Sequence, residues 1–255
     1  MARLHVGLLS TAKNKRDILK ALDSLPPGLN EIYDEIIDRI LSQDADEAEL
    51  AKSILGWITY AKTPLTTKQL QQALAVPLNS TYYDEDTETD EQILISACLG
   101  IVTIDHETNI IQLVHYTTQE YIEGIRETQF PEAQTLIAKT CLTCLGFDRF
   151  TQRAIMLGKQ VLDDYVFLRY ATRFWAEHIN DVKRNPGVQE TALRFLTEKR
   201  NHDAIYAIVD GWLLRPKGGT LLHAMAWYGL VTIYQIVLVG TFAIPRRYLS
   251  ALDYI

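Results

Sequence analysis

Residues 95–122, ISACLGIVTIDHETNIIQLVHYTTQEYI, contain the pattern that decides the fold. Two β-branched runs, IVTI at 101–104 and IIQLV at 110–114, are separated by the polar segment DHETN, which predicts a two-stranded hairpin. The apolar segment before the hairpin ends at Gly100 and is typical of a short helix. A helical pattern resumes at Thr117. The stretch therefore predicts a helix, a hairpin and a second helix.

Further helices are predicted upstream. After the Pro-Pro-Gly break at 26–28, apolar residues recur at steps of three and four as far as Ile40. A second apolar stripe runs from Leu50 to Ala61, and a third, shorter helix follows Thr66, whose hydroxyl suits an N-cap. Three helices, a two-stranded wing and another helix within about 80 residues is the order of a winged-helix domain.

The segment from Asn79 to Glu91 is rich in acidic side chains and has no apolar period, which predicts a solvated loop. Beyond Pro131 the pattern is helical as far as Asp210. The expected fold is mainly α: a winged-helix domain with a small β-hairpin wing, followed by an α-helical array that ends in an ankyrin-like repeat.

The ankyrin-like repeat is predicted from TLLHAMAWYGLVTIYQIVLVG at 220–240. This segment has the Thr-x-Leu-His start of an ankyrin unit at Thr220 to His223, then small residues and Gly229 before a second helix. In such a unit the imidazole of His223 would tie the tight turn to the backbone. Thr220, His223 and Gly229 are therefore expected to be structural.

The charge balance disfavours nucleic-acid binding. The chain of 255 residues carries 25 Lys and Arg against 32 Asp and Glu, a net charge of −7. The helix that would enter a major groove, residues 90–100, has no basic side chain, and the wing turn carries Asp105 and Glu107. A nucleic-acid-binding winged helix remains an alternative, but it is disfavoured.

Three cysteines, an odd number, do not form a disulfide framework and indicate a reducing compartment, so we expect a cytoplasmic protein. Cys141 and Cys144 have redox or zinc spacing but lie on an apolar helical segment, which favours packing.

The amino-terminal stretch lacks the features of a signal peptide. The apolar run at 230–244 is shorter than the roughly 20 residues that a membrane-spanning helix needs. No membrane association is expected.

Sequence motifs for catalysis are absent. The chain has no phosphate-binding loop, no G-x-S-x-G nucleophile elbow and no H-E-x-x-H, and we expect no metal site and no enzyme activity. His178, Asp163 and Asp164 are interpreted as parts of a satisfied helix and its surface.

Four blocks occur in a specific order: ALDSLPPGLNEIYDEIIDRI, ILGWITYAKTPLTTKQLQQAL, the stretch 95–122, and YATRFWAEHI followed by TLLHAMAWYGL. Together they strongly resemble the region that follows the NACHT NTPase domain in fungal NACHT-ankyrin proteins, which are signal-transduction ATPases of the STAND type with an innate-immunity-like role. The resemblance covers nearly all of the chain. The winged-helix unit of this family is often labelled after GPI inositol-deacylase.

The resemblance implies four units: residues 1–45 as the helical remainder of the NTPase module, 46–127 as the winged helix, 128–210 as a helical connector and 211–255 as the start of the ankyrin-like repeat. It also implies a non-enzymatic regulatory role. The expected partners are a NACHT NTPase domain, in cis or in trans, and a protein bound by the ankyrin repeats. An uncapped repeat would also permit self-association.

The resemblance implies a role for the segment VHYTTQEY as well. It is similar to the winged-helix signature of NACHT receptors, and His115, Thr117, Gln119, Glu120 and Tyr121 match it in turn. In that family the histidine reaches the β-phosphate of ADP held by the NTPase domain. No cofactor is expected in this chain itself, because ADP or ATP is implied only for a parent NTPase domain.

Two alternatives stay open at this point. In the first, His115 serves only to end a strand and cap the helix that begins near Thr117. The GPI inositol-deacylase label would imply a hydrolase, which the missing nucleophile elbow disfavours.

Overall fold

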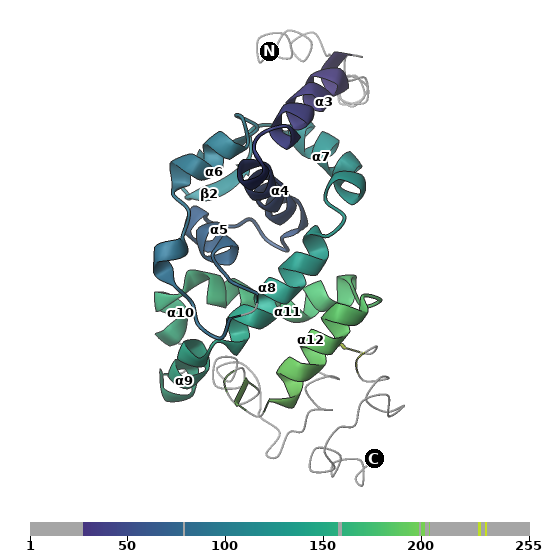
Figure 1. The fold of residues 1–255 in the computed structure, drawn as a ribbon. Coiled ribbons are helices and arrows are strands. Elements are labelled where there is room, and N and C mark those ends of the chain that lie inside the picture. Colours follow the sequence, from purple (N-terminus) through teal and green to yellow (C-terminus); the bar gives the residue numbers. More distant parts are fainter. Residues whose placement is uncertain are drawn as a thin grey trace, which may run out of the picture.

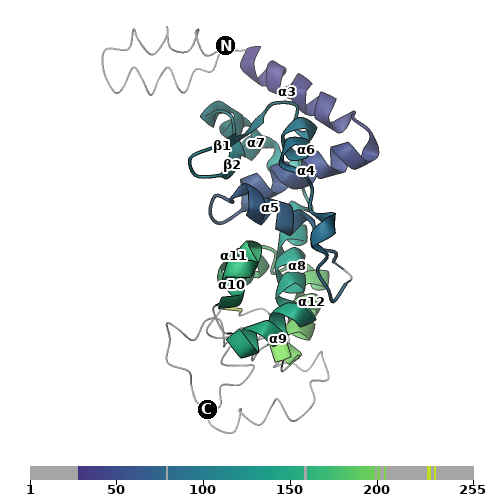
Figure 2. The same ribbon diagram turned by 90° about the vertical axis from the view of Figure 1, so that its left-hand side faces the viewer.

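The computed structural model describes residues 28–78, 80–157 and 160–198, together with positions 200, 201, 204, 229, 230 and 233. Its elements stack in two tiers, with α3 to α7 and the hairpin in one and α8 to α12 in the other (Figure 1 and Figure 2). The described part is mainly helical with one small antiparallel hairpin, as the sequence predicts.

The first tier follows the predicted order. Its elements are α3 (Gly28–Leu41), α4 (Ala45–Tyr60), α5 (Thr67–Leu74), the short 3₁₀ helix η1 (Glu85–Thr87), α6 (Glu91–Ala97), β1 (Val102–Asp105), β2 (Ile110–Leu113) and α7 (Tyr116–Gln129). Thr66 caps α5 in a reciprocal capping box with Gln69, which confirms the predicted N-cap. Left-handed backbone at Leu99 and Gly100, with φ of 46° and 87°, ends α6 and turns the chain into β1.

The hairpin pairs β1 with β2 in an antiparallel register that sets Val102 opposite Leu113. A third short segment borders β2 on its other edge. The amide of Ile111 donates to the carbonyl oxygen of Leu65 at 3.1 Å, and Thr66 forms an isolated bridge with Ile110. The chain between α4 and α5 is therefore held beside the strand that leads directly to His115.

The second tier contains two helices that the sequence analysis did not single out. Its elements are α8 (Ala133–Gly146), α9 (Asp148–Leu157), α10 (Val161–Asp164), α11 (Val166–Asp181) and α12 (Pro186–Thr197). α9 and α10 are the two additions. Cys141 and Cys144 lie fully inside α8, and burial raises the pKa of both thiols, as expected of packing residues.

The two tiers share one continuous hydrophobic core. The ring of Trp57 in α4 meets the rings of Phe167 and Tyr170 in α11 edge-on, at centroid distances of 5.5 and 5.9 Å. The side chain of Gln72 in α5 accepts a hydrogen bond from the amide of Phe167 at 2.9 Å. The first tier thus satisfies a donor at the buried start of α11, which fixes the two tiers against each other.

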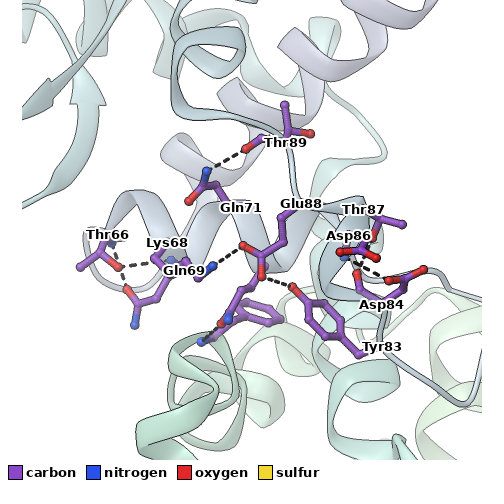
Figure 3. A network of polar contacts seen from close by, with 12 residues as sticks. Thr66, Lys68, Gln69, Gln71, Tyr83, Asp84, Asp86, Thr87, Glu88 and Thr89 are labelled. Atoms are coloured by element: carbon purple, nitrogen blue, oxygen red, sulfur yellow. Dashed lines mark hydrogen bonds and ion pairs between the residues drawn. The ribbon is translucent and has the colours of Figure 1, made fainter.

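The acidic segment 79–91 is only partly the solvated loop that the sequence predicts. Residues 84–87 are exposed, but Tyr83 is buried among the rings of Phe147, Phe150 and Tyr165. The loop is also tied to α5 (Figure 3): the Tyr83 hydroxyl donates to Glu88 at 2.8 Å, and the Lys68 ammonium lies 2.5 Å from the same carboxylate. Burial of one aromatic ring therefore overrides the loop's polar composition.

The ring nitrogens of His178 were expected to have hydrogen-bond partners, and only one of the two has a partner among the described residues. Its side chain is buried, and Nε2 lies 2.7 Å from the Tyr170 hydroxyl, but Nδ1 has no hydrogen-bond partner in the part of the chain that the structure describes. Asp163 is a surface residue paired with Arg169 at 2.8 Å, as interpreted from the sequence.

The predicted ankyrin-like repeat lies almost entirely outside the described residues. Thr220 and His223 are among those not described. Gly229 has a left-handed backbone with φ of 64°, and Leu230 and Ile233 are buried. None of the helices that the structure describes is long and apolar enough to cross a membrane.

Candidate functional site

A cleft of about 710 Å³ opens where the end of α4, the turn that follows it, β2 and the start of α7 meet. Its lining residues are Ile58, Thr59, Ala61, Lys62, Thr63, Pro64, Leu65, the run from Ile111 to Tyr116, Gln119 and Glu123. A cleft of this size falls within the range that small-molecule ligands occupy. It contains two residues of the predicted signature, His115 and Gln119.

His115 is the N-cap of α7. Its backbone is extended, with φ of −153°, and its Nδ1 accepts a hydrogen bond from the amide of Thr117 at 3.2 Å. The side chain is exposed, and its ring lies 4.4 Å from the ring of Tyr116. The prediction that His115 caps a helix is confirmed.

Behind His115 lies a chain of hydroxyl groups. Thr117 Oγ1 is 2.9 Å from His115 Nδ1 and 2.8 Å from the hydroxyl oxygen of Tyr33, and Thr118 Oγ1 donates to the same Tyr33 oxygen at 3.0 Å. Thr117 and Thr118 are each only 1% exposed. The network is therefore protected from water and ends at the exposed imidazole of His115.

A second contact joins the same two helices. The hydroxyl of Tyr121 in α7 donates to a carboxylate oxygen of Asp34 in α3 at 2.5 Å, and the rings of Tyr121 and Tyr33 lie 5.1 Å apart. Burial, followed by this hydrogen bond, raises the pKa of Tyr121. We call these contacts of Tyr33 and Asp34 with α7 the α3–α7 clasp. Through it, the helix before the winged-helix core is held directly against the signature segment.

The remaining two signature residues lie apart from the clasp. The side-chain amide of Gln119 donates to Glu123 at 2.9 Å, and both residues line the cleft. Glu120 is exposed and is not among the lining residues. The structure therefore brings His115, Thr117 and Tyr121 into one connected cluster, with Gln119 at the cleft and Glu120 on the surface.

The charges around the cleft are mixed. The Lys62 ammonium is paired with Asp181 at 2.6 Å, and Glu123 adds a carboxylate. The start of α7, a helix of 14 residues, contributes the partial positive charge of its amide groups beside His115. The arrangement suits hydrogen bonding to an anionic group at the α7 start. Among the described residues, no cluster of three or more His, Cys, Asp or Glu side chains could hold a metal ion.

The helix that would read DNA in a nucleic-acid-binding relative is α6. Its exposed side chains include Glu91, Gln92 and the 48% exposed Ile93. This surface carries the amide of Gln92, but beside it stand a carboxylate and an apolar residue, and none of the three side chains is basic.

Sequence reasoning did not find Tyr33, Asp34 or Thr118. Tyr33 and Asp34 belong to the segment interpreted as the remainder of another module, and Tyr33 is 84 positions from Thr117. Thr118 lies next to the matched Thr117, so its position in the signature was the one available signal.

Comparison with known proteins agrees with this fold. Residues 38–131 match the family model described as GPI inositol-deacylase, winged helix domain. That range holds α4 to α7 and the hairpin, so the chain contains a winged-helix domain there.

Two fungal proteins are similar over longer ranges. Azaphilone pigments biosynthesis cluster protein L of Monascus ruber is 28% identical over 214 residues, which are 75% of this chain and 43% of that protein. The vegetative incompatibility protein HET-E-1 of Podospora anserina is 21% identical over 194 residues, 66% of this chain and 14% of that protein. The chain thus spans less than half the length of these relatives. No solved structure matches the chain.

Proposed function

We propose that this chain is a non-enzymatic regulatory module of a NACHT-type signalling NTPase, in which the winged helix senses the nucleotide state of the NTPase domain. The winged-helix match at 38–131 and the similarity to HET-E-1 support the assignment to a regulatory module. The proposed setting is the cytoplasm, and the proposed partner of the winged helix is the NTPase domain, in cis or in trans.

One observation carries the proposal. The imidazole of His115 is exposed at a cleft of about 710 Å³ while its Nδ1 is held by the start of α7. In the proposed complex the imidazole donates to a phosphate group at this cleft, and a hydrogen bond to an anion is stronger than one between neutral groups. The partial positive charge at the N-terminus of α7 also favours a bound anion.

The coupling would work by population shift. If the ADP-bound NTPase domain makes the contact to His115 and the ATP-bound domain does not, ADP stabilises the closed arrangement by the free energy of that contact. The α3–α7 clasp supports this scheme, because it links the sensing segment to the helix that precedes the winged helix. A movement of α3 would then displace the start of α7, and the reverse.

The carboxy-terminal segment is proposed to bind a protein partner through ankyrin repeats. This part of the proposal rests on the Thr-x-Leu-His motif at Thr220 to His223. Ankyrin units recognise partners by surface shape, so no catalytic group is needed there.

The native polypeptide tests the assignment. An antibody against residues 28–198 would be used to isolate the protein from the cells that make it, and its mass and bound partners would be measured by mass spectrometry. We expect an NTPase domain with a phosphate-binding loop, either within the same polypeptide or bound to it. Isolation of the chain with no NTPase in either form would contradict the proposal.

A further inference from the structure

We propose that Tyr33 in α3 is a positioning residue for His115: acting through the Thr117 hydroxyl, it holds the imidazole as the tautomer that carries its proton on Nε2. The value of this tautomer for anion recognition rests on the proposed function. The positioning itself rests only on the hydrogen bonds between the two helices.

The direction of each hydrogen bond follows from the number of protons available. Each hydroxyl group has one proton to donate. The Thr117 amide donates to His115 Nδ1, so the Thr117 hydroxyl can only donate to that nitrogen and, with no second proton, accepts from Tyr33 at 2.8 Å; Tyr33 itself accepts from Thr118 at 3.0 Å. The proton of Thr117 Oγ1 is then directed to His115 Nδ1 at 2.9 Å.

A second donor reaches the same nitrogen. The backbone amide of Thr117 lies 3.2 Å from Nδ1 and has no other role than to donate. Two donors aimed at Nδ1 require that it carry a lone pair. The proton of the neutral ring must therefore be on Nε2, which makes that nitrogen a hydrogen-bond donor without any net charge on the ring.

Burial explains why this order persists. The two threonines are 1% exposed and Tyr33 is half-buried, which reduces the competition of water for the hydroxyl protons. His115 is the exposed end of the chain. Tyr33 thus sets the donor character of a residue 82 positions away.

The consequence for recognition is specific. A cap made by the Thr117 amide alone leaves the hydroxyl of Thr117 able to accept from an Nδ1–H, which competes with the Nε2–H form. With Tyr33 donating to Thr117, the Thr117 proton is directed toward Nδ1, where it opposes a second proton on that nitrogen. An anionic group such as a diphosphate then meets a donor already in place and needs no proton uptake from solvent.

Nuclear magnetic resonance of the full chain tests the positioning. The six histidines would be labelled with nitrogen-15, and correlations between ring carbon-bound protons and ring nitrogens would report which nitrogen of each ring is protonated. Spectra would be recorded at about pH 8.5, where imidazoles are neutral. The signals of His115 would be identified by their loss in His115→Gln.

We expect His115 of the wild-type chain to show a protonated Nε2 and an unprotonated Nδ1. Tyr33→Phe keeps the ring but removes the donor, and it should raise the ratio of the Nδ1–H to the Nε2–H form by about fivefold, the effect of one hydrogen bond of ordinary strength. Thr118→Val removes the bond that orders the Tyr33 proton and should shift the ratio in the same direction.

Tyr121→Phe is the matched control. It removes a phenol hydroxyl that also joins α3 to α7, but the hydrogen bond of this hydroxyl goes to Asp34 and not to the hydroxyl groups that lead to His115, and the variant keeps the Tyr121 ring beside Tyr33. Its His115 signals should keep the wild-type pattern. An Nδ1–H form in the wild-type chain, an unchanged ratio in Tyr33→Phe, or an equal shift in Tyr121→Phe would each overturn the proposal.

The spectra are recorded without nucleotide, so they test the positioning of His115 independently of the proposed nucleotide-sensing function. If the tautomer responds to Tyr33→Phe but the native protein has no NTPase partner, the positioning stands and the proposed function fails. If the tautomer does not respond and the NTPase is found, the reverse holds.

Discussion

The hydroxyl oxygen of Tyr33 lies 2.8 Å from Oγ1 of Thr117, which joins α3 to the start of α7 across 84 positions of the sequence. Beside it, Tyr121 donates to Asp34. The clasp has a third hydrogen bond, from Thr118 to Tyr33. Two of these three hydrogen bonds thus use signature residues, Thr117 and Tyr121, and all three hold a helix that was assigned to another module from the sequence. The signature segment therefore has a structural task in this chain as well as its proposed role toward nucleotide.

The packing of the helices predicts that replacing two different glycines by alanine has opposite effects on the free energy of unfolding. At Gly56 in α4, a Cβ would lie 2.8 Å from the Cβ of Ala133 in α8, whereas at Gly124 in α7 nothing lies within 4 Å. Gly56→Ala should lower the free energy of unfolding by about 1–2 kcal/mol, because overpacking exceeds the gain in helix propensity.

Gly124→Ala should raise the free energy of unfolding by about 0.5–1 kcal/mol, because it gains propensity without a clash. Urea denaturation of both variants measures the difference. Equal effects in the two variants would show that α4 and α8 are not in close contact.

The capping of α11 by another helix predicts a second loss of stability. Gln72 accepts from the buried amide of Phe167, and the residue before α11, Tyr165, forms no side-chain cap. Gln72→Ala should cost about 1–3 kcal/mol, because it leaves a buried donor unsatisfied. Gln92→Ala, at an exposed position of α6, is the control and should change little. Similar values for the two variants in thermal or urea denaturation would argue against this cap.

His178 predicts a pH dependence. Burial first, and the nearby charge of Lys62 second, lower the pKa of His178 to about 4, against the partly opposing charge of Asp181. Since an unfolded histidine has a pKa near 6.5, the unfolded chain binds a proton first as the pH falls. The stability contribution is therefore complete above about pH 6.5 and is lost progressively toward pH 4.

Between pH 7 and pH 5 this loss should be about 2 kcal/mol in the free energy of unfolding. His178→Gln should remove that part of the pH dependence, whereas His106→Gln, on the exposed turn of the hairpin, should retain it. Urea denaturation at the two pH values provides the measurement. The same pH dependence in His178→Gln and in the wild-type chain would rule out His178 as its source.

Much of the fold could be predicted from local pattern. The apolar steps of α3, the cap at Thr66 and the β-branched runs of the hairpin each express a local preference that the tertiary structure retains. The burial of Tyr83 and the helix α9 were missed, because they depend on contacts between distant parts of the chain. Tyr83 is buried only because Phe147, Phe150 and Tyr165 meet there from distant positions.

Some features of the candidate site could likewise be predicted from the sequence, and others could not. The cap at His115 could be predicted, because it depends on neighbouring residues. The contacts of Tyr33 with Thr117 and Thr118 could not, since no local periodicity pairs residues so far apart. The cleft depends on how α4, β2 and α7 pack, which also has no local signature.

The most direct test of the proposed function is the rate of ADP release from the NTPase domain that carries or binds this chain, measured with a fluorescent ADP analogue. His115→Ala, which removes every side-chain donor, should accelerate release by at least about tenfold, the effect of losing one hydrogen bond to a charged group. His106→Ala provides the matched control and should leave the rate unchanged. An unchanged rate in His115→Ala would contradict the nucleotide-sensing role and leave His115 as the cap of α7 alone.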